Sequence, residues 1–421
     1  MRATRFVCAS VLAGALALVP SSASAQESPQ ALRQEIDQLR KDFDALKQQY
    51  GDRLAALDAK LAAAEGTSPP AAAVPPPSAA PPPTLGSAVA NSKVFNPDMA
   101  VIGDFLGAGG RNLVKPSPAL EMHESELSLQ AVVDPYARAD FFVAFGEEGV
   151  ELEEGFITLT ELPGGLLTKV GKMRAAFGKV NTLHNHSLTW TDRPLATQNL
   201  LGGEEGIGDA GISVARLIPN PWIFLEATGQ VFRGDSSDVF KSNQRSDLSY
   251  VGHLRGYQDI SESSNLDLGF SYSRGHNDSG GVSIAEDASS SFTTQLYGLD
   301  ATVRWKPLRR SIYQSFVGRS EWIWSRRDQP DGLQRASGFF VSGDYQVDRR
   351  WFTGVRFDRS DRATDSSLTD TGGSFIVTYW PSEFSQVRAQ YRRTNYALAS
   401  SANEILFQFQ FSIGAHGAHP F

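Results

Sequence analysis

Cysteine is almost absent from this chain of 421 residues, since Cys8 is its only thiol. A single thiol forms no disulfide within the chain and offers no set of thiolates for a metal ion. Cys8 also lies in the stretch that we interpret as an export signal. We therefore expect the exported protein to have no disulfide framework, no thiolate-bound metal and no lipid anchor on cysteine.

Long apolar runs are equally scarce. The longest, residues 6–19, follows Arg2 and Arg5 and precedes the small residues Ala23-Ser24-Ala25. Its 14 residues fall short of the roughly 20 that a helix needs to cross a bilayer. A basic start, a short apolar run and a small-residue cleavage site are typical of a secretory signal peptide. We expect residues 1–25 to be removed, and the remainder to have no membrane-spanning helix.

Positive charge is in deficit, with 39 Lys and Arg against 47 Asp and Glu and a formal charge of −8. A nucleic-acid partner therefore has no electrostatic support. The sequence also contains no nucleophile elbow, phosphate-binding glycine loop or zinc-protease helix motif. We expect no nucleic-acid partner, no enzyme activity and no cofactor.

Residues 26–65 carry apolar side chains at helical spacing. The gaps alternate between four and three residues at Leu32, Ile36, Leu39, Phe43, Leu46 and Tyr50, and the series resumes at Leu54, Leu57 and Leu61. This pattern is typical of a coiled coil. It predicts a periplasmic helix through which chains associate, with a single solvated helix as the alternative. Residues 66–96, rich in Ala and Pro, predict an extended linker.

Residues 97–421 predict a transmembrane β-barrel. Sixteen segments of alternating polarity are separated by turn residues, and single-chain bacterial barrels have an even number of strands. The fold class that we expect is therefore all-β, a sixteen-stranded antiparallel porin-like barrel preceded by a short coiled coil. The expected strands are 99–106, 119–133, 136–145, 150–161, 166–177, 210–218, 222–233, 248–260, 265–276, 293–306, 311–326, 337–347, 351–361, 372–380, 384–396 and 403–415.

Two further patterns support the barrel. Every second connection is a short turn, such as Asp134-Pro135, whereas most others are longer, and outer-membrane barrels show this asymmetry between their ends. Within the last expected strand, 403–415, apolar side chains alternate with mostly polar ones over residues 405–413. In the rival architecture, a soluble sandwich, the charged faces of such strands would be buried at great cost. A water-filled lumen removes that cost.

The connection 178–209 is far longer than the others, and long loops in compact domains are usually functional. It predicts a helix with Asp192 as cap, Pro194 in its first turn and Gly202-Gly203 after its end. Folded inward, this loop would narrow the lumen, although a position outside the barrel is the alternative. Its expected constriction residues are Asp192, Arg193, Glu204, Glu205 and Asp209.

Charged residues on the expected inner faces divide by position in the chain. Acids come first and arginines later, at Glu124, Glu126, Asp140, Glu226, Asp267, Arg304, Arg319, Arg356, Arg388 and Arg392. If the two groups face each other, they create a transverse field that disfavours apolar solutes. Ordinary solvated lumen charge is the alternative for each residue.

Two histidine pairs are weak candidates for a metal site. His184 and His186 lie in the long loop, and His416 and His419 lie near the end. Imidazole is a common ligand of divalent transition metals. Solvated or hydrogen-bonded histidines are the alternative.

The segment Val101-Ile102-Gly103-Asp104-Phe105 after a coiled coil, the strand pattern and the terminal Phe421 resemble the phosphate-selective porin type of outer-membrane channel. The last eight residues also resemble tails of proteins labelled outer-membrane or TonB-dependent receptors. This resemblance implies a homotrimer, recognition of Phe421 by the barrel-assembly machinery and passive uptake. The long loop departs from the phosphate-selective pattern because it is acidic rather than rich in Lys and Arg.

The sequence therefore predicts an outer-membrane porin, surrounded by lipid, through which small hydrophilic solutes or ions diffuse. One alternative is an envelope tether that uses the coiled coil, with the barrel as its anchor. Another is a channel for the specific uptake of a ligand or metal.

Overall fold

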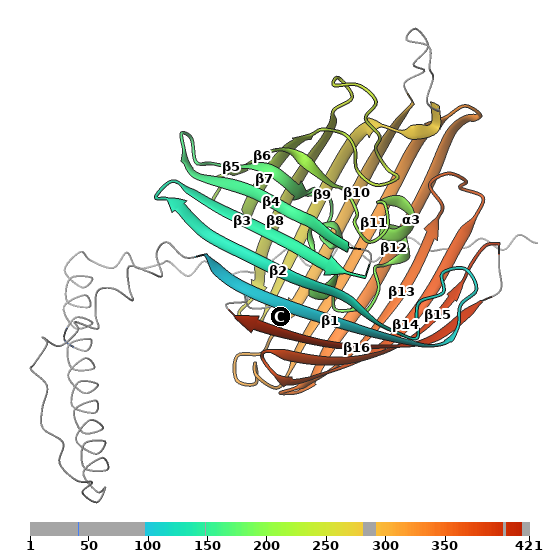
Figure 1. Cartoon of the computed structure of the whole chain (residues 1–421). Helices are drawn as coiled ribbons and strands as arrows, with labels where there is room; N and C mark the ends of the chain where they lie inside the picture. Colours follow the sequence, from blue (N-terminus) through green and yellow to red (C-terminus); the bar gives the residue numbers. More distant parts are fainter. Residues whose placement is uncertain (1–40, 42–96, 148, 281–291, 399–400, 415–421) are drawn as a thin grey trace, which may run out of the picture. The chain divides into compact units, whose positions relative to one another are not determined.

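The computed structural model describes residues 41, 97–147, 149–280, 292–398 and 401–414. Neighbouring strands in the sequence pair antiparallel, and β1 pairs with β16 to close a barrel of sixteen strands (Figure 1). The strands are β1 Asp98–Arg111, β2 Leu120–Asp134, β3 Ala137–Gly146, β4 Gly149–Leu162, β5 Leu166–Arg174, β6 Gly208–Leu217, β7 Phe224–Phe232, β8 Ser249–Ser261, β9 Ser264–His276, β10 Thr293–Trp305, β11 Ser315–Gln329, β12 Gly332–Asp348, β13 Trp351–Asp361, β14 Thr369–Ser382, β15 Ser385–Asn395 and β16 Ala402–Gly414.

Four short helical segments lie in the connections, namely η1 Val180–Thr182, η2 Asn185–Ser187, α3 Leu195–Leu200 and η3 Asp278–Gly280. Three of them belong to the β5–β6 connection. Among the described residues, no helix has the length and apolar character needed to cross a membrane.

The two faces of the barrel wall differ as the alternation predicts. In β16, Ile405 and Phe407 are 63% and 42% exposed, whereas Gln408 and Gln410 on the inner face are almost completely buried. Side chains of successive strand residues point to opposite faces. The outer face is therefore apolar, and the inner face carries the polar and charged groups.

All sixteen expected strands are confirmed, although most of their ends shift by one to five residues, with the largest shifts at the end of β1 and the start of β12. β1 continues to Arg111 through Gly109 and Gly110, which we assigned to a loop, because both glycines pair with β16. The expected long connection 327–336 is wrong, since β11 and β12 pair as far as Gln329 and Gly332. The alternation of apolar and polar side chains ends among the polar residues of this segment, but the backbone pairing of β11 and β12 continues to a tight turn.

Several predicted features lie outside the described residues. They are the signal peptide 1–25, the coiled coil 26–65 apart from Lys41, the linker 66–96, and the tail residues His416, His419 and Phe421.

Candidate functional site in the long loop

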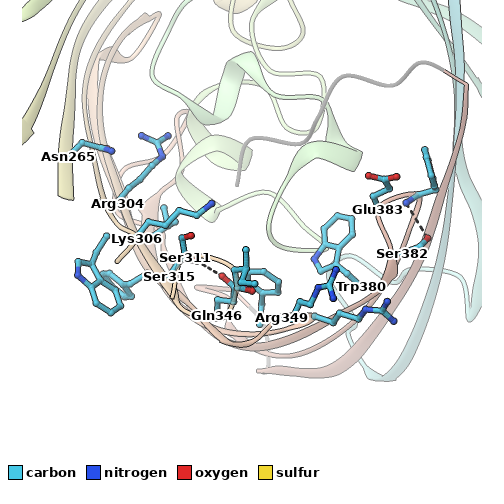
Figure 2. Close-up of a pocket in the computed structure, with 17 residues that line it drawn as sticks. Asn265, Arg304, Lys306, Ser311, Ser315, Gln346, Arg349, Trp380, Ser382 and Glu383 are labelled. Atoms are coloured by element: carbon cyan, nitrogen blue, oxygen red, sulfur yellow. Dashed lines mark hydrogen bonds between the residues drawn. The ribbon is translucent and has the colours of Figure 1, made fainter. Parts of the chain in front are cut away.

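Residues 175–207, between β5 and β6, form a loop that lies inside the ring of strands. Its backbone N–H groups donate to inner-wall side chains of three strands, at Ser271 of β9 (2.9 Å), Asp358 of β13 (3.2 Å) and Gln390 of β15 (3.0 Å). α3 packs against β11, β12, β13 and β14. In Figure 2 the green ribbon of this region is enclosed by the strands. We call residues 175–207 the inner loop.

Small residues on the inner wall allow the inner loop to approach closely. A Cβ added at Gly338 of β12 would lie 3.0 Å from the Cβ of Ala196, and one at Gly298 of β10 would lie 3.0 Å from the ring of Phe177. Leu200 and Leu201 at the end of α3 are buried in the same apolar cluster as Phe177. The inner loop is therefore held by packing as well as by polar contacts.

Asp192 joins the middle of the inner loop to a basic part of the wall. Its carboxylate accepts 2.9 Å hydrogen bonds from Arg356 of β13 and Arg392 of β15, and it also accepts one from the amide of Gln390. Burial raises the pKa of Asp192, but the two guanidinium groups outweigh burial and lower the pKa to about 2. The side chain is therefore ionised at neutral pH.

This role of Asp192 corrects one prediction. The observed cap of α3 is Pro194, which makes no side-chain capping bond, and Asp192 caps no helix. Its carboxylate instead accepts charge-assisted hydrogen bonds from the two arginines. The helix does end before Gly202 and Gly203, which both have positive φ, as expected.

His184 joins the inner loop to an acidic part of the wall. Its Nδ1 lies 2.8 Å from Glu126 and 2.5 Å from Glu153, and its Nε2 lies 2.9 Å from Glu154. Burial lowers the pKa of His184, but the three carboxylates outweigh burial and raise it to about 11. His186 lies beside the same group, with Nδ1 3.6 Å from Glu126.

A β-bulge supplies two of these carboxylates. β3 and β4 pair Phe142 with Glu154 and Val143 with Leu152, so Glu153 is an extra residue in β4. Consecutive strand residues normally face opposite sides, and a bulge re-aims a side chain. Glu153 and Glu154 can therefore both face His184 inside the barrel.

The inner loop separates two cavities. Thr189 and Trp190 line a central cavity of about 340 Å³, whereas Thr191 and Asp192 line a second cavity of about 170 Å³ toward the longer connections. Because consecutive residues line different cavities, segment 189–192 stands between them. Both acidic and basic side chains line the central cavity. They include Lys179, Glu226, Asp267, Asp300, Arg304, Arg319 and Glu321.

A third cavity, of about 740 Å³, opens at the end with the short turns. Its wall carries Trp380, Arg349 and Glu383, which Figure 2 shows around the inside of the strand ring. Arg304 of β10 lines this cavity and the central one. Its side chain is 34% exposed, so a charged group stands where the two spaces meet.

The other expected constriction residues have different surroundings. Arg193 is buried and donates to the carbonyls of Val180 and Leu183, so it stabilises the inner loop itself. Glu204 and Glu205 are exposed beyond α3. Asp209 lies inside β6 and accepts a bond from the backbone N–H of Asp235.

The structure places all ten expected lumen charges on the inner face. Besides the contacts above, Asp267 is paired with Lys179 and Arg255, and Arg319 with Asp344. Arg392 also binds Glu404. Two residues have partners close by in the wall, since Asp140 is paired with Arg138 in the same strand and Arg388 donates to Gln408 of the neighbouring strand. A role for these charges in a filter stays a prediction.

Sequence reasoning missed Glu153, Glu154 and Gln390. Strict alternation allows only one of two consecutive glutamates to face inward, and no sequence signal marks the bulge. The amide of Gln390 gives no hint of a partner, because Asp192 is 198 residues away.

No protein-family model matches this chain. An uncharacterized protein of Aquifex aeolicus is 29% identical over 387 residues, covering 79% of this chain and 81% of that protein.

Solved structures with a similar fold are bacterial outer-membrane proteins. The anion-selective porin of Comamonas acidovorans matches with a TM-score of 0.52 and 11% identity, over 75% of this chain and 99% of that one. OprB of Pseudomonas putida matches with a TM-score of 0.52 and 11% identity, over 78% and 96%. OmpT, an outer membrane protein of Vibrio cholerae, matches with a TM-score of 0.51 and 11% identity, over 75% and 97%. At these identities the likeness concerns the fold, and the chain has a porin-like sixteen-stranded barrel.

Proposed function

We propose that this protein is a channel of the bacterial outer membrane through which small hydrophilic solutes or ions diffuse. The observation that carries the proposal is the contrast between an apolar outer face and a charged inner face on a closed barrel. Lipid suits the outer face, and water suits the inner one. The porin-like neighbours support the same conclusion.

The inner loop sets the size and charge of the passage in this proposal. Segment 189–192 stands between two cavities, and Asp192 fastens it to Arg356 and Arg392. On another side, His184 fastens the loop to the glutamates of β2 and β4. The loop therefore spans from an acidic wall to a basic wall, an arrangement that creates a transverse field and disfavours apolar solutes.

A liposome swelling experiment tests diffusion and narrowing together. Vesicles that contain the purified protein should swell in small sugars, at rates that fall steeply with solute size. A variant in which residues 186–201 are replaced by a short Gly/Ser linker should admit larger solutes. Vesicles without protein give the baseline, and swelling no faster than this baseline would contradict the channel function. Identical size limits for both proteins would contradict narrowing by the loop.

We also propose that the chain forms homotrimers, with residues 26–65 as a periplasmic coiled coil and Phe421 as the signal for the barrel-assembly machinery. The helical spacing of Leu32, Ile36 and Leu39 supports the coiled coil, since an isolated helix leaves its apolar seam exposed. Light scattering in detergent should give a trimer for the full chain and a smaller mass after deletion of 26–65. A monomeric full chain would contradict this assembly.

A further inference from the structure

Six side chains meet where the inner loop touches β2 and β4, and the channel function gives them no chemical task. They are Glu124 and Glu126 of β2, Glu153 and Glu154 of β4, and His184 and His186 of the inner loop. Two triads have all their donor atoms within 4.8 Å of one another, namely Glu124, Glu126 and His186, and Glu126, Glu153 and His184. Glu126 belongs to both triads.

The charges in this group are only partly balanced by other side chains. Of the four carboxylate charges, one is balanced by the guanidinium of Arg174 at 3.5 Å from Glu153 and one by protonated His184, so an excess of two negative charges remains. Arg193 is nearby, but its N–H groups are occupied by carbonyl and amide oxygens of the inner loop. Concentrated buried charge of one sign is costly unless a cation neutralises it.

A separate observation also indicates a missing partner. Glu124 is 7% exposed, and its Oε1 accepts no hydrogen bond from any described residue. Nδ1 of His186 lies 3.9 Å from this oxygen, which is too far for a hydrogen bond. Glu124 is one of the residues of the first triad, so this triad contains a buried carboxylate oxygen that lacks a hydrogen-bond donor among the described residues.

The bulge in β4 strengthens the case. In a regular strand without this bulge, Glu153 and Glu154 would point to opposite faces, and only one of them would face the inner loop. Bulges are common next to functional sites because they re-aim side chains. Here the bulge adds a donor to the triad around Glu126.

We propose that these residues bind a divalent metal ion such as Zn²⁺, with Glu126 as the ligand that both triads share. The bound ion would hold the inner loop against the barrel wall. Imidazole with carboxylate donors and no thiolate suits Zn²⁺, Mn²⁺ or Fe²⁺, whereas Ca²⁺ uses oxygen donors alone. Donor atoms around a tetrahedral Zn²⁺ lie about 3.3 Å apart. The observed spacing within 4.8 Å therefore needs an inward movement of only about 1 Å per ligand.

A zinc titration of the full-length protein tests the site without any measurement of transport. The chain is purified in detergent, stripped with a chelator and titrated with Zn²⁺ by calorimetry. All proteins carry His416→Ala and His419→Ala, so that the terminal histidines contribute nothing. Glu126→Gln keeps the shape of the side chain and removes the shared ligand, and Glu226→Gln in the central cavity is the matched control.

The expected result is binding by the background protein and by the control. Changing a group that only orients a metal ligand typically weakens binding by about 10–100-fold, so loss of Glu126 itself should weaken it at least tenfold. Zn²⁺ should also raise the unfolding temperature of the control but not of Glu126→Gln. The same titration with Ca²⁺ should give no comparable binding.

Three results would overturn the proposal. The first is no zinc binding by the background protein, which would leave protonated His184, paired with its glutamates, as the complete account of the group. The second is equal zinc affinity of Glu126→Gln and Glu226→Gln. The third is equal affinity for Ca²⁺ and Zn²⁺. Circular dichroism of each variant verifies that the barrel is folded, and His186→Gln provides a second ligand change should Glu126→Gln fail to fold.

Discussion

The carboxylate of Asp192 and the guanidinium of Arg356 form a 2.9 Å ion pair across the interior of the barrel. Asp192 belongs to the connection that leads into β6, and Arg356 lies on β13, seven strands further around a ring of sixteen. One contact therefore links nearly opposite parts of the wall. The ion pair holds the inner loop in the interior of the barrel, in space that solutes would otherwise occupy.

Neutralising Asp192 should loosen the inner loop. Asp192→Asn removes the charge that binds Arg356 and Arg392, although both arginines keep a second carboxylate, Asp358 and Glu404 respectively. Hydrogen bonds to charged groups contribute about 2 kcal/mol, so we expect a loss of stability of that order and a larger, noisier single-channel conductance. Glu205→Gln, on an exposed residue of the same loop, is the control. Equal conductance of the two variants would contradict the role of Asp192.

The Asp192 contact should survive mild acid. The pKa of this carboxyl falls from 3.8 to about 2 in the folded protein, so the contact contributes stability above pH 4 and loses it as pH falls toward 2. The difference in conductance between the natural protein and Asp192→Asn should therefore stay constant from pH 7 to about 4 and fall to about half near pH 2, where half of the Asp192 side chains are protonated. Recordings at a series of pH values test this. A difference that disappears already near pH 6 would argue against it.

Gly338 should be intolerant of a larger side chain. A Cβ at this position meets Ala196 of α3 at 3.0 Å and the Oγ of Ser360 at 2.6 Å. Gly338→Val should cost about 1–3 kcal/mol through overpacking, and it should displace α3 from β12. Thermal unfolding and conductance would both change. Gly373→Val is the matched control, because nothing lies within 4 Å of its added Cβ, and it should behave as the natural protein does.

Arg304 should influence ion selectivity. Its guanidinium stands where the central cavity meets the cavity at the short-turn end. Arg304→Gln removes one positive charge from the path, so permeability to cations relative to anions should rise. The reversal potential in a KCl gradient measures this ratio directly. Arg245→Gln, on an exposed connection at the other end, should leave it unchanged, and a similar shift in both variants would indicate only a general effect of net charge.

Much of the fold could be predicted from the sequence because each strand has two chemically different faces. The residues 405–413 alternate so regularly that the prediction of which side chains point outward follows directly, and the burial pattern of β16 confirms it. The ends of β11 and β12 could not be predicted in this way. Beyond the apolar band both faces are polar, so alternation disappears while backbone pairing continues.

Only part of the candidate site could be predicted from the sequence. The acidic residues and the two histidines of the long connection 178–209 indicated which side chains to examine, among them Asp192 and His184. Their partners come from strands far away in the sequence, and the bulge at Glu153 depends on pairing that no local pattern reveals. Contacts across the lumen depend on the closure of the whole barrel, because closure determines which strands lie opposite the inner loop.

The most direct test of the central claim, that the inner face lines water and the outer face contacts lipid, is the conductance of the purified full-length protein in a planar lipid bilayer. We predict discrete steps of current that grow with salt concentration and whose sign preference changes in Arg304→Gln. If the bilayer shows no increase in current although the protein is verified to have inserted, the account would be contradicted.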